Sequence, residues 1–308
     1  MSHGRKPVAH TAGGRRDPIG LQLIRWSDPG YPAPLRAVAH PPQTLYVRGG
    51  WRPEDAHAVA VVGSRRASPY GIAVAEWLGR ELARCGVTVV SGLARGIDGA
   101  AHRGALEGGG RTIAVLGCGV DVLYPPEHAG LARRIMRAGA VLSELPPGTP
   151  PLKQHFPMRN RLISGLALGV VVVEGRERSG AVITTDFALD QGREVFAVPG
   201  SIFDETSRTP HRLLQQGAKP VTRVEDILDE LGLAVLRPLT GAGPAAALEG
   251  IEAEVYGQLD LQPRHPDALA LRCHRPVAEV SRALTVLEVR GLARALPGQR
   301  YVRANVEG

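Results

Sequence analysis

The segment Lys153–Ser179, KQHFPMRNRLISGLALGVVVVEGRERS, decides the fold. It contains a run of consecutive valines, Val170–Val173, that leads directly into a turn of glycine and arginines. A strand that is apolar at every position is typical of a parallel sheet with helices on both faces. The segment therefore predicts a buried strand whose carboxyl end opens onto a polar, basic loop.

Cationic and aromatic side chains crowd together just before this strand. They are Lys153, Phe156, Arg159, Asn160 and Arg161. Lys and Arg pair with phosphates, and a nucleobase can stack on a phenyl ring or on a guanidinium plane. The cluster therefore fits a flat, anionic ligand. The alternative is that Phe156 fills the core and the arginines lie on a solvated helix face.

Strand-like runs alternate with helical segments on both sides of the valine run. The predicted strands are Leu45–Arg48, Val59–Val62, Val87–Val90, Thr112–Leu116, Ala140–Leu142, Val195–Val198 and Pro220–Thr222. The predicted helices are Pro69–Cys85, Ile97–Glu107, Glu127–Ala138, Arg161–Leu168, Ala181–Gln191, Pro210–Gln216 and Val224–Leu231. This alternation predicts an α/β fold with a doubly wound, mostly parallel sheet.

Glycines and polar side chains follow nearly every predicted strand. In such sheets ligands bind at the carboxyl ends of the strands, where glycine lets the backbone come close and helix N-termini present free N–H groups. The strand-end positions that we single out as supporting loops are Gly63, Ser91, Gly92, Arg95, Gly117 and Gly200.

The chain is expected to divide into four parts: a flexible basic tail (1–20), an α/β domain (21–232), a linker (233–247) and a small C-terminal domain (248–308). Helical patterns at Leu248–Leu259, Pro266–Leu271 and Pro276–Val289 precede a hairpin that turns at Pro297-Gly298. Three helices and a hairpin predict a winged helix. Its many arginines are compatible with DNA binding and, equally, with a solvated protein-interaction module.

Composition narrows the class of protein. The 308 residues carry a formal net charge of +7, which favours a polyanionic partner, although 34 of the 37 cations are arginines, a bias that base composition can also produce. The three cysteines lie far apart, so neither a disulfide framework nor a metal site is expected. No apolar signal segment or membrane span is evident, and we expect a cytoplasmic protein without a cofactor.

Catalytic motifs are mostly missing. There is no P-loop, and the glycine motif that begins at Gly117 lacks its third glycine, so nucleotide hydrolysis and a nicotinamide cofactor are disfavoured. Asp98 and His102 lie four residues apart on one predicted helix and could pair, but a local hydrogen bond that fixes the preceding loop is the favoured interpretation. The other carboxylates considered for hydrolysis are Glu144, Glu174 and Asp186.

The order and spacing of these motifs resemble the bacterial DNA-processing protein A (DprA, also called Smf) family. The resemblance rests on GSRR at 63–66, SGLARGIDGAAH at 91–102, HFPxRNR at 155–161, ISGL at 163–166, RSG at 178–180 and PGS at 199–201, and runs from about Leu21 to Leu231. It implies an extended Rossmann-like domain, without catalytic activity, that binds single-stranded DNA, forms a homodimer and delivers the strand to RecA recombinase during natural transformation.

The resemblance also implies roles for individual residues. The basic residues of the GSRR turn and of the HFPxRNR segment hold backbone phosphates, and an aromatic residue there contacts a base. The DNA-binding residues of this chain are accordingly expected to be Ser64, Arg65, Arg66, Lys153, Phe156, Arg159, Asn160, Arg161, Ser179 and Gly180.

Two departures from the family pattern are visible. The residues before Leu21 are too few for the N-terminal helical domain that many members carry, and His211 replaces an amide that is common in the family. A second hypothesis is a nucleotide phosphoribohydrolase-like Rossmann enzyme, in which Asp186 stands in for a ribose-binding glutamate; its glycine-rich motif is absent here. A third, a transcription factor driven by the C-terminal domain, ranks last because no base-reading set of Arg, Asn and Gln is evident.

Overall fold

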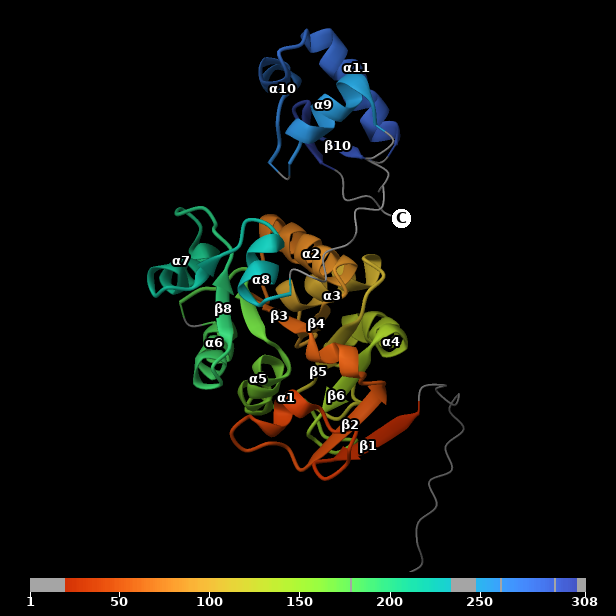
Figure 1. The fold of residues 1–308 in the computed structure, drawn as a ribbon, viewed down its shortest axis with the longest axis vertical. Coiled ribbons are helices and arrows are strands. Elements are labelled where there is room, and N and C mark those ends of the chain that lie inside the picture. The colour runs from red at the N-terminus through yellow and green to blue at the C-terminus, as the bar shows by residue number, and fades with distance from the viewer. Residues whose placement is uncertain (1–19, 178, 234–247, 261, 291, 304–308) are drawn as a thin grey trace, which may run out of the picture.

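The computed structural model describes residues 20–177, 179–233, 248–260, 262–290 and 292–303. The first two ranges contain a sheet of nine strands in the order β1-β2-β6-β5-β4-β3-β7-β8-β9 (Figure 1). The strands are β1 (Leu21–Arg25), β2 (Thr44–Gly49), β3 (Ala58–Val62), β4 (Thr88–Ser91), β5 (Thr112–Val115), β6 (Ala140–Ser143), β7 (Gly169–Val172), β8 (Glu194–Ala197) and β9 (Lys219–Pro220).

The sheet is doubly wound. From β6 to β9 all neighbouring strands are parallel, whereas β1 and β2 add to the β6 edge as antiparallel strands. The chain proceeds from β3 outward to β6 and then returns to place β7 on the other side of β3. The direction of winding therefore reverses between β3 and β7. The predicted α/β class, with its extended, mostly parallel sheet, is confirmed.

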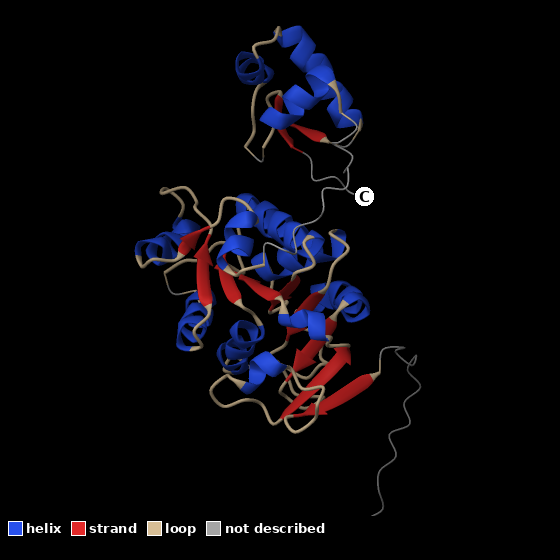
Figure 2. Ribbon diagram, viewed as in Figure 1, coloured by secondary structure: helices blue, strands red, loops and turns tan. Residues whose placement is uncertain are grey.

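Helices cover both faces of the sheet (Figure 2). One face packs on α1 (Ala33–Arg36), α5 (His155–Leu166), α6 (Gly180–Asp190) and α7 (Arg208–Gln215), and the other on α2 (Pro69–Arg84), α3 (Ile97–Glu107), α4 (Ala129–Ala138) and α8 (Glu225–Glu230). Along β3, alternate residues enter the two cores, Ala58, Ala60 and Val62 on one side and Val59 and Val61 on the other. A strand buried on both faces explains the uninterrupted apolar runs.

Helix α5 begins six residues earlier than the sequence predicted. It starts at His155 rather than Arg161, with Pro157 in its first turn. Proline is tolerated there because the first N–H groups of a helix have no intrahelical partner. The basic segment is therefore the first half of a helix and not a loop.

The stretch before β3 joins the main sheet. It forms β1, α1 and β2, of which only part of β2 was predicted. Tyr31 and Leu35 are buried, and the Tyr31 hydroxyl donates a hydrogen bond to the Pro42 carbonyl at 2.8 Å. Burial raises the pKa of Tyr31 to about 12.

The C-terminal residues form a small unit with its own core. It consists of α9 (Gly250–Gln258), α10 (Pro266–Cys273), α11 (Val277–Val289), β10 (Ala293–Leu296) and β11 (Arg300–Arg303). The hairpin turns at Pro297-Gly298 as predicted, with Gly298 at a φ of 79°.

Two further findings bear on function. Among the described residues, no helix is long and apolar enough to cross a membrane. Within the same part of the chain, no group of three or more His, Cys, Asp or Glu side chains could hold a metal ion.

Candidate nucleic-acid interface

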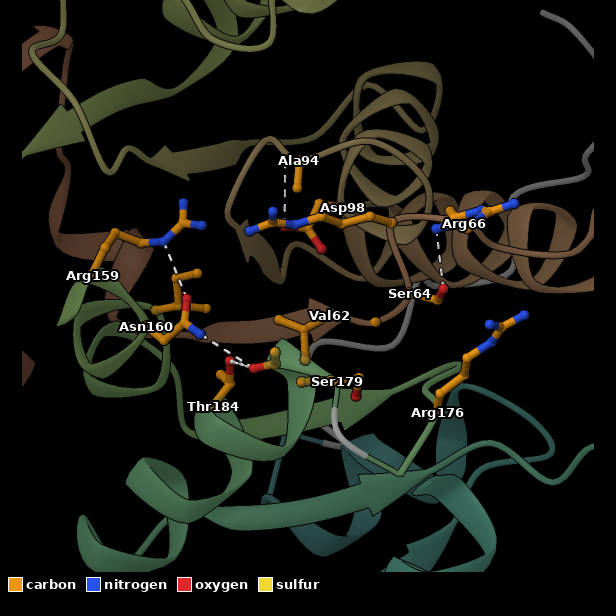
Figure 3. A pocket seen from close by; sticks show the side chains of 15 residues that line it. Val62, Ser64, Arg66, Ala94, Asp98, Arg159, Asn160, Arg176, Ser179 and Thr184 are labelled. Atoms are coloured by element: carbon orange, nitrogen blue, oxygen red, sulfur yellow. Dashed lines mark hydrogen bonds between the residues drawn. The ribbon is translucent and has the colours of Figure 1, made fainter. Parts of the chain in front are cut away.

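A cavity of about 550 Å³ opens where the winding of the sheet reverses, at the carboxyl ends of β3 and β7 (Figure 3). In doubly wound sheets this is the position at which ligands bind. The lining residues are Val62, Gly63, Ser64, Arg65, Arg66, Ala94, Asp98, Arg159, Asn160, Ile163, Arg176, Ser179, Gly180, Ala181 and Thr184. Seven of the ten predicted DNA-binding residues are among them.

The outer wall of the cavity is cationic. Arg65 and Arg66 are exposed, and neither has a carboxylate partner among the described residues. Figure 3 shows Arg66 and Arg176 on one side of the cavity, opposite Arg159 and Asn160. Arg176 pairs with Glu205 at 3.6 Å, but both side chains are more than 60% exposed. Such a pair contributes little free energy, so Arg176 is available to an incoming anion.

The N-terminus of α6 forms the facing wall. Ser179, Gly180 and Ala181 line the cavity, and no acidic residue occupies the first turn of the helix. Ser179 Oγ is buried and has no hydrogen-bond partner among the described residues. The free N–H groups of a helix start and a nearby hydroxyl are well suited to hold a phosphate.

The Glu174 carboxylate holds Ser68, the N-cap residue of α2. It accepts a hydrogen bond from the Ser68 N–H at 2.9 Å and another from the Ser68 hydroxyl. Gly71 must lack a side chain, because a Cβ there would lie 2.4 Å from Glu174 Cδ. The carboxylate is therefore used to fix the start of α2 directly behind the Arg65–Arg66 turn.

Arg159 forms the floor of the cavity but also joins two strands. It is 4% exposed, and its Nη1 donates to the Gly92 carbonyl at 2.8 Å and to the Val115 carbonyl. Burial lowers the pKa of its guanidinium to about 10, and Asp98 opposes that shift. The side chain therefore remains charged at neutral pH. Its positive charge faces the cavity while its position is fixed by the backbone.

Asp98 and His102 do not form a catalytic pair. The Asp98 carboxylate accepts hydrogen bonds from the Gly92 and Ala94 N–H groups at 3.2 and 3.4 Å, so it fixes the loop that precedes its own helix. Burial raises its pKa, against the nearby Arg159 charge. His102 Nδ1 instead contacts the Thr112 hydroxyl at 2.6 Å. The favoured interpretation, a local loop-fixing hydrogen bond, is confirmed.

The helical period places the residues of α5 on different sides of the helix. Arg159, Asn160 and Ile163 line the cavity, and Phe156, three and four residues before Arg159 and Asn160, lies on the same side of the helix. Asn160 Nδ2 donates to the Gly180 carbonyl at 3.3 Å and so connects α5 to the start of α6. Arg161 does not line the cavity; it pairs with Glu144, another of the considered carboxylates, and both side chains are less than 20% exposed.

Phe156 does not line the cavity but lies next to the lining residue Arg65, and we call this neighbourhood the rim of the cavity. The Arg65 guanidinium covers its ring at 5.2 Å from the centroid, and the ring of Tyr124 lies 5.8 Å away at 44°. Lys153, two residues before α5, is exposed. Together these residues place an aromatic surface and exposed cations beside the cavity.

Most of the predicted supporting positions stabilise the fold around the cavity and do not line it. The Ser91 hydroxyl donates to the Val61 carbonyl at 2.6 Å, and Arg95 pairs with Glu127. Gly92 and Gly117 leave room for the Arg159 guanidinium and the Phe156 ring, respectively, and Gly200 for Ser207. Among these, only Gly63 lines the cavity.

Sequence reasoning missed two contributors. Arg176 lines the cavity, and its position in the loop after β7 was a sequence signal for binding, but it was not among the predicted DNA-binding residues. Tyr124 lies 32 residues before Phe156, and no local pattern relates the two rings. Asp186, the residue required by the phosphoribohydrolase hypothesis, is exposed in the second turn of α6 and does not line the cavity.

The fold and this cavity define a Rossmann-like protein with a basic cavity at the topological switch point of its sheet. The chain belongs to the family described as DNA recombination-mediator protein A, whose model matches residues 22–232. Residues 240–299 match the DprA winged helix domain.

Relatives and solved structures agree with this assignment. The chain is 46% identical to "DNA processing protein DprA" of Bacillus subtilis over 213 residues, 69% of this chain and 72% of the relative. It is 42% identical to "Protein Smf" of Escherichia coli over 281 residues, 89% and 75% of the two chains.

Among solved structures, DNA processing protein A of Streptococcus pneumoniae matches with a TM-score of 0.65 and 45% identity, over 68% of this chain and 74% of that one. The Helicobacter pylori protein, whose structure is described by its single-stranded DNA binding mode, matches with a TM-score of 0.61 and 27% identity, over 69% and 96%.

Proposed function

We propose that this chain is a non-catalytic protein that binds single-stranded DNA at the cavity between β3 and β7, protects the incoming strand and loads RecA recombinase on it. The setting is natural transformation and recombination in the cytoplasm. One observation carries the proposal: exposed Arg65 and Arg66 and the open start of α6 face one another across a cavity whose rim holds Phe156.

The chemistry of the two walls suits a sugar-phosphate backbone. Cations and helix N–H groups supply affinity that falls with added salt, because each phosphate contact releases counterions. Ser64 and Ser179 add hydroxyl groups that line the same cavity. None of these groups reads base identity, so binding is expected to tolerate different sequences.

The rim explains a preference for single strands. Aromatic rings and arginine planes stack on bases that are free of a partner, and a duplex hides those faces. Phe156, with Arg65 across its ring, offers such a platform beside the phosphate site. The relative from Helicobacter pylori, known for its single-stranded DNA binding mode, supports this choice of ligand.

The proposal includes a homodimer and a contact with RecA on the acidic side of the domain. Ile202 and Phe203 are 80% and 91% exposed in the turn after β8. Two adjacent apolar side chains that protrude into solvent favour a protein partner. Asp226 and Glu230, on α8 near the β9 edge, contribute acidic side chains to this side of the domain.

The test is fluorescence anisotropy of a labelled single-stranded oligonucleotide, titrated with the protein at several salt concentrations and competed with duplex of the same sequence. We expect tight, salt-sensitive binding and a clear preference for the single strand. Absent binding, or a preference for the duplex, contradicts the proposal. Nucleoside monophosphates in place of DNA then test the cavity for an enzyme-like ligand.

The choice of variants follows from the cavity. Arg66→Ala removes an exposed cation with no carboxylate partner among the described residues, and Arg84→Ala, an exposed arginine on α2 that pairs with Glu81, is its matched control. Arg159→Ala is a poor probe, since it also removes the bonds that join the ends of β4 and β5.

A further inference from the structure

We propose that the exposed face of α4 is a second contact surface for single-stranded DNA. Arg133, Arg134 and Arg137 on this face hold backbone phosphates of nucleotides that extend past Phe156 and Tyr124. This inference rests on the proposed function, since it concerns the same polymer. It adds residues that lie outside the cavity and outside every motif considered above.

The three arginines share one side of the helix. The buried residues of α4 are Leu131, Ala132, Ile135 and Met136. At 100° per residue, Arg133, Arg134 and Arg137 fall together on the opposite side, and all three are exposed. Arg133 and Arg137 are four residues apart, a spacing at which like charges repel.

These charges are not compensated within the described part of the chain. Ten other cations of the large domain have a carboxylate partner: Arg80, Arg84, Arg95, Arg103, Arg111, Arg161, Arg176, Arg208, Lys219 and Arg223. Among the described residues, the three arginines of α4 have none, and in this they resemble Arg65 and Arg66 at the cavity. A concentration of free positive charge on one face favours an anionic partner.

The start of α4 follows the rim of the cavity closely along the chain. The Tyr124 ring lies 5.8 Å from the Phe156 ring and is 38% exposed. From Tyr124 the chain passes through the short 3₁₀ helix η2 (Pro126–His128) directly into α4. Glu127, the acidic residue at this junction, is engaged by Arg95, and His128 Nδ1 contacts the Leu93 carbonyl at 3.0 Å.

The geometry therefore assigns a path to the single-stranded DNA. A base that stacks on Phe156 is followed by one near Tyr124, and the next phosphates meet α4. The helix has ten residues and a length of about 15 Å, enough for several nucleotides of an extended strand. The occupant is a flexible single strand, because the path bends from the sheet edge onto a helix face.

The test compares two oligonucleotide lengths. The variant Arg133→Ala, Arg134→Ala, Arg137→Ala is titrated with single strands of about five and about fifteen nucleotides, lengths within the usual range of single-strand site sizes. We expect affinity for the longer strand to fall about tenfold or more and that for the shorter strand to stay within about twofold. The slope of log K against log salt for the longer strand should become less negative by about 2.

A matched variant controls for net charge. Arg25→Ala, Arg84→Ala, Arg223→Ala removes three exposed arginines from other faces of the same domain. It should bind both lengths like the wild type. The thermal unfolding temperature of the α4 variant should be no lower than that of the wild type, because only repelling charges have been removed.

The other outcomes separate the two proposals. If the α4 variant binds both lengths like the wild type, the face is merely solvated and the inference is wrong. Equal losses for both lengths, or an equal loss in the control variant, overturn it as well. If the wild type binds neither strand, the proposed function itself fails, and this surface fails with it.

Discussion

In the proposed DNA complex, Arg65 and Phe156 combine two sources of binding free energy in one contact. The guanidinium over the ring offers its charge to a phosphate and its plane, with the ring, to a base. The two contributions have different dependence on salt. Phosphate pairing releases counterions, whereas stacking on a neutral ring does not.

The first prediction separates these contributions. Arg65→Ala and Lys153→Ala each weaken single-strand binding and make the salt slope less negative by about 0.7 per contact. Phe156→Ala weakens binding by about 1–3 kcal/mol with little change in slope. Anisotropy titrations over a salt series measure both quantities. If the three variants and the wild type have the same affinity and the same salt slope, the proposed placement of the DNA strand would be falsified.

The burial of His102 should make the free energy of unfolding of the large domain depend on pH. Its ring is fully buried, and burial lowers its pKa to about 3, with smaller contributions from His128, Arg159 and Arg103. The unfolded chain binds the proton near pH 6.5, so the stability that neutral His102 provides is complete above that pH and is lost as the pH falls. Between about pH 7 and about pH 5 the loss amounts to about 2 kcal/mol.

The measurement compares wild type with His102→Gln. From about pH 7 to about pH 5, the free energy of unfolding of the wild type should fall by about 2 kcal/mol relative to that of the variant. Tryptophan fluorescence follows the large domain specifically, because Trp26, Trp51 and Trp77 are the only tryptophans of the chain. Parallel pH profiles of the two proteins would show that His102 gains its proton in the folded state.

At the scale of elements, the start of α2 is a test of how the cavity is supported. The Ser68 hydroxyl accepts from the Gly71 N–H at 3.1 Å and donates to buried Glu174. Ser68→Ala removes a helix cap and a hydrogen bond to a carboxylate, and should destabilise the large domain by about 2–3 kcal/mol. Ser68→Thr should retain most of the stability.

Denaturant unfolding followed by tryptophan fluorescence measures this effect. Ser201→Ala is the control, since the Ser201 hydroxyl also accepts a backbone N–H, that of Phe203, but in an exposed turn. It should change stability by less than about 0.5 kcal/mol. A Ser68→Ala loss no larger than that of the control would mean that Glu174 finds another partner.

The elements also show what sequence can predict. Parallel strands buried on both faces leave a continuous apolar run, so β3 to β8 were located to within one residue or two at each end. The alternation of strands and helices also predicted that the carboxyl ends of the strands lie at one edge of the sheet. Ser64, Arg66 and Ser179 were therefore expected at one site, and all three line the cavity. These are consequences of local pattern and a general rule of topology.

Other features depend on packing that no local pattern records. Arg159 is held by carbonyls 67 and 44 residues away, so its burial could not be read from the basic cluster. Arg161 was expected beside it, yet once α5 begins at His155 the helical period turns it toward Glu144. Pro157 was the available signal, because proline suits a first helical turn.

At the scale of the whole molecule, the exposed turn after β8 predicts self-association. Replacing Ile202 and Phe203 together with Ser should shift the protein toward monomer, since it removes two protruding apolar side chains. Light scattering over a concentration series measures the mass. Val289→Ser, at an 84% exposed position of the C-terminal unit, is the control. An unchanged mass in the double variant would place the contact elsewhere.

The arginines of the C-terminal unit are largely engaged within it. Arg264, Arg275 and Arg290 pair with Asp260, Glu254 and Glu252, respectively. The exposed side of α11 carries Glu279 and Glu288 as well as Arg282. Its basic composition is therefore a weaker sign of DNA binding than the sequence alone indicated, and a protein partner gains weight.

The reversal of winding between β3 and β7 has a mechanical consequence. One wall of the cavity belongs to the half of the sheet that runs from β3 to β6, and the other to the half that begins at α5. In the proposed complex, a DNA strand seated there clamps the two halves together and favours the state in which both are folded. At a DNA concentration a hundred times the dissociation constant, that clamp adds about 2.7 kcal/mol to the stability of the domain. On the proposed function, the amount of single-stranded DNA around the protein thus shifts the equilibrium between its folded and unfolded states.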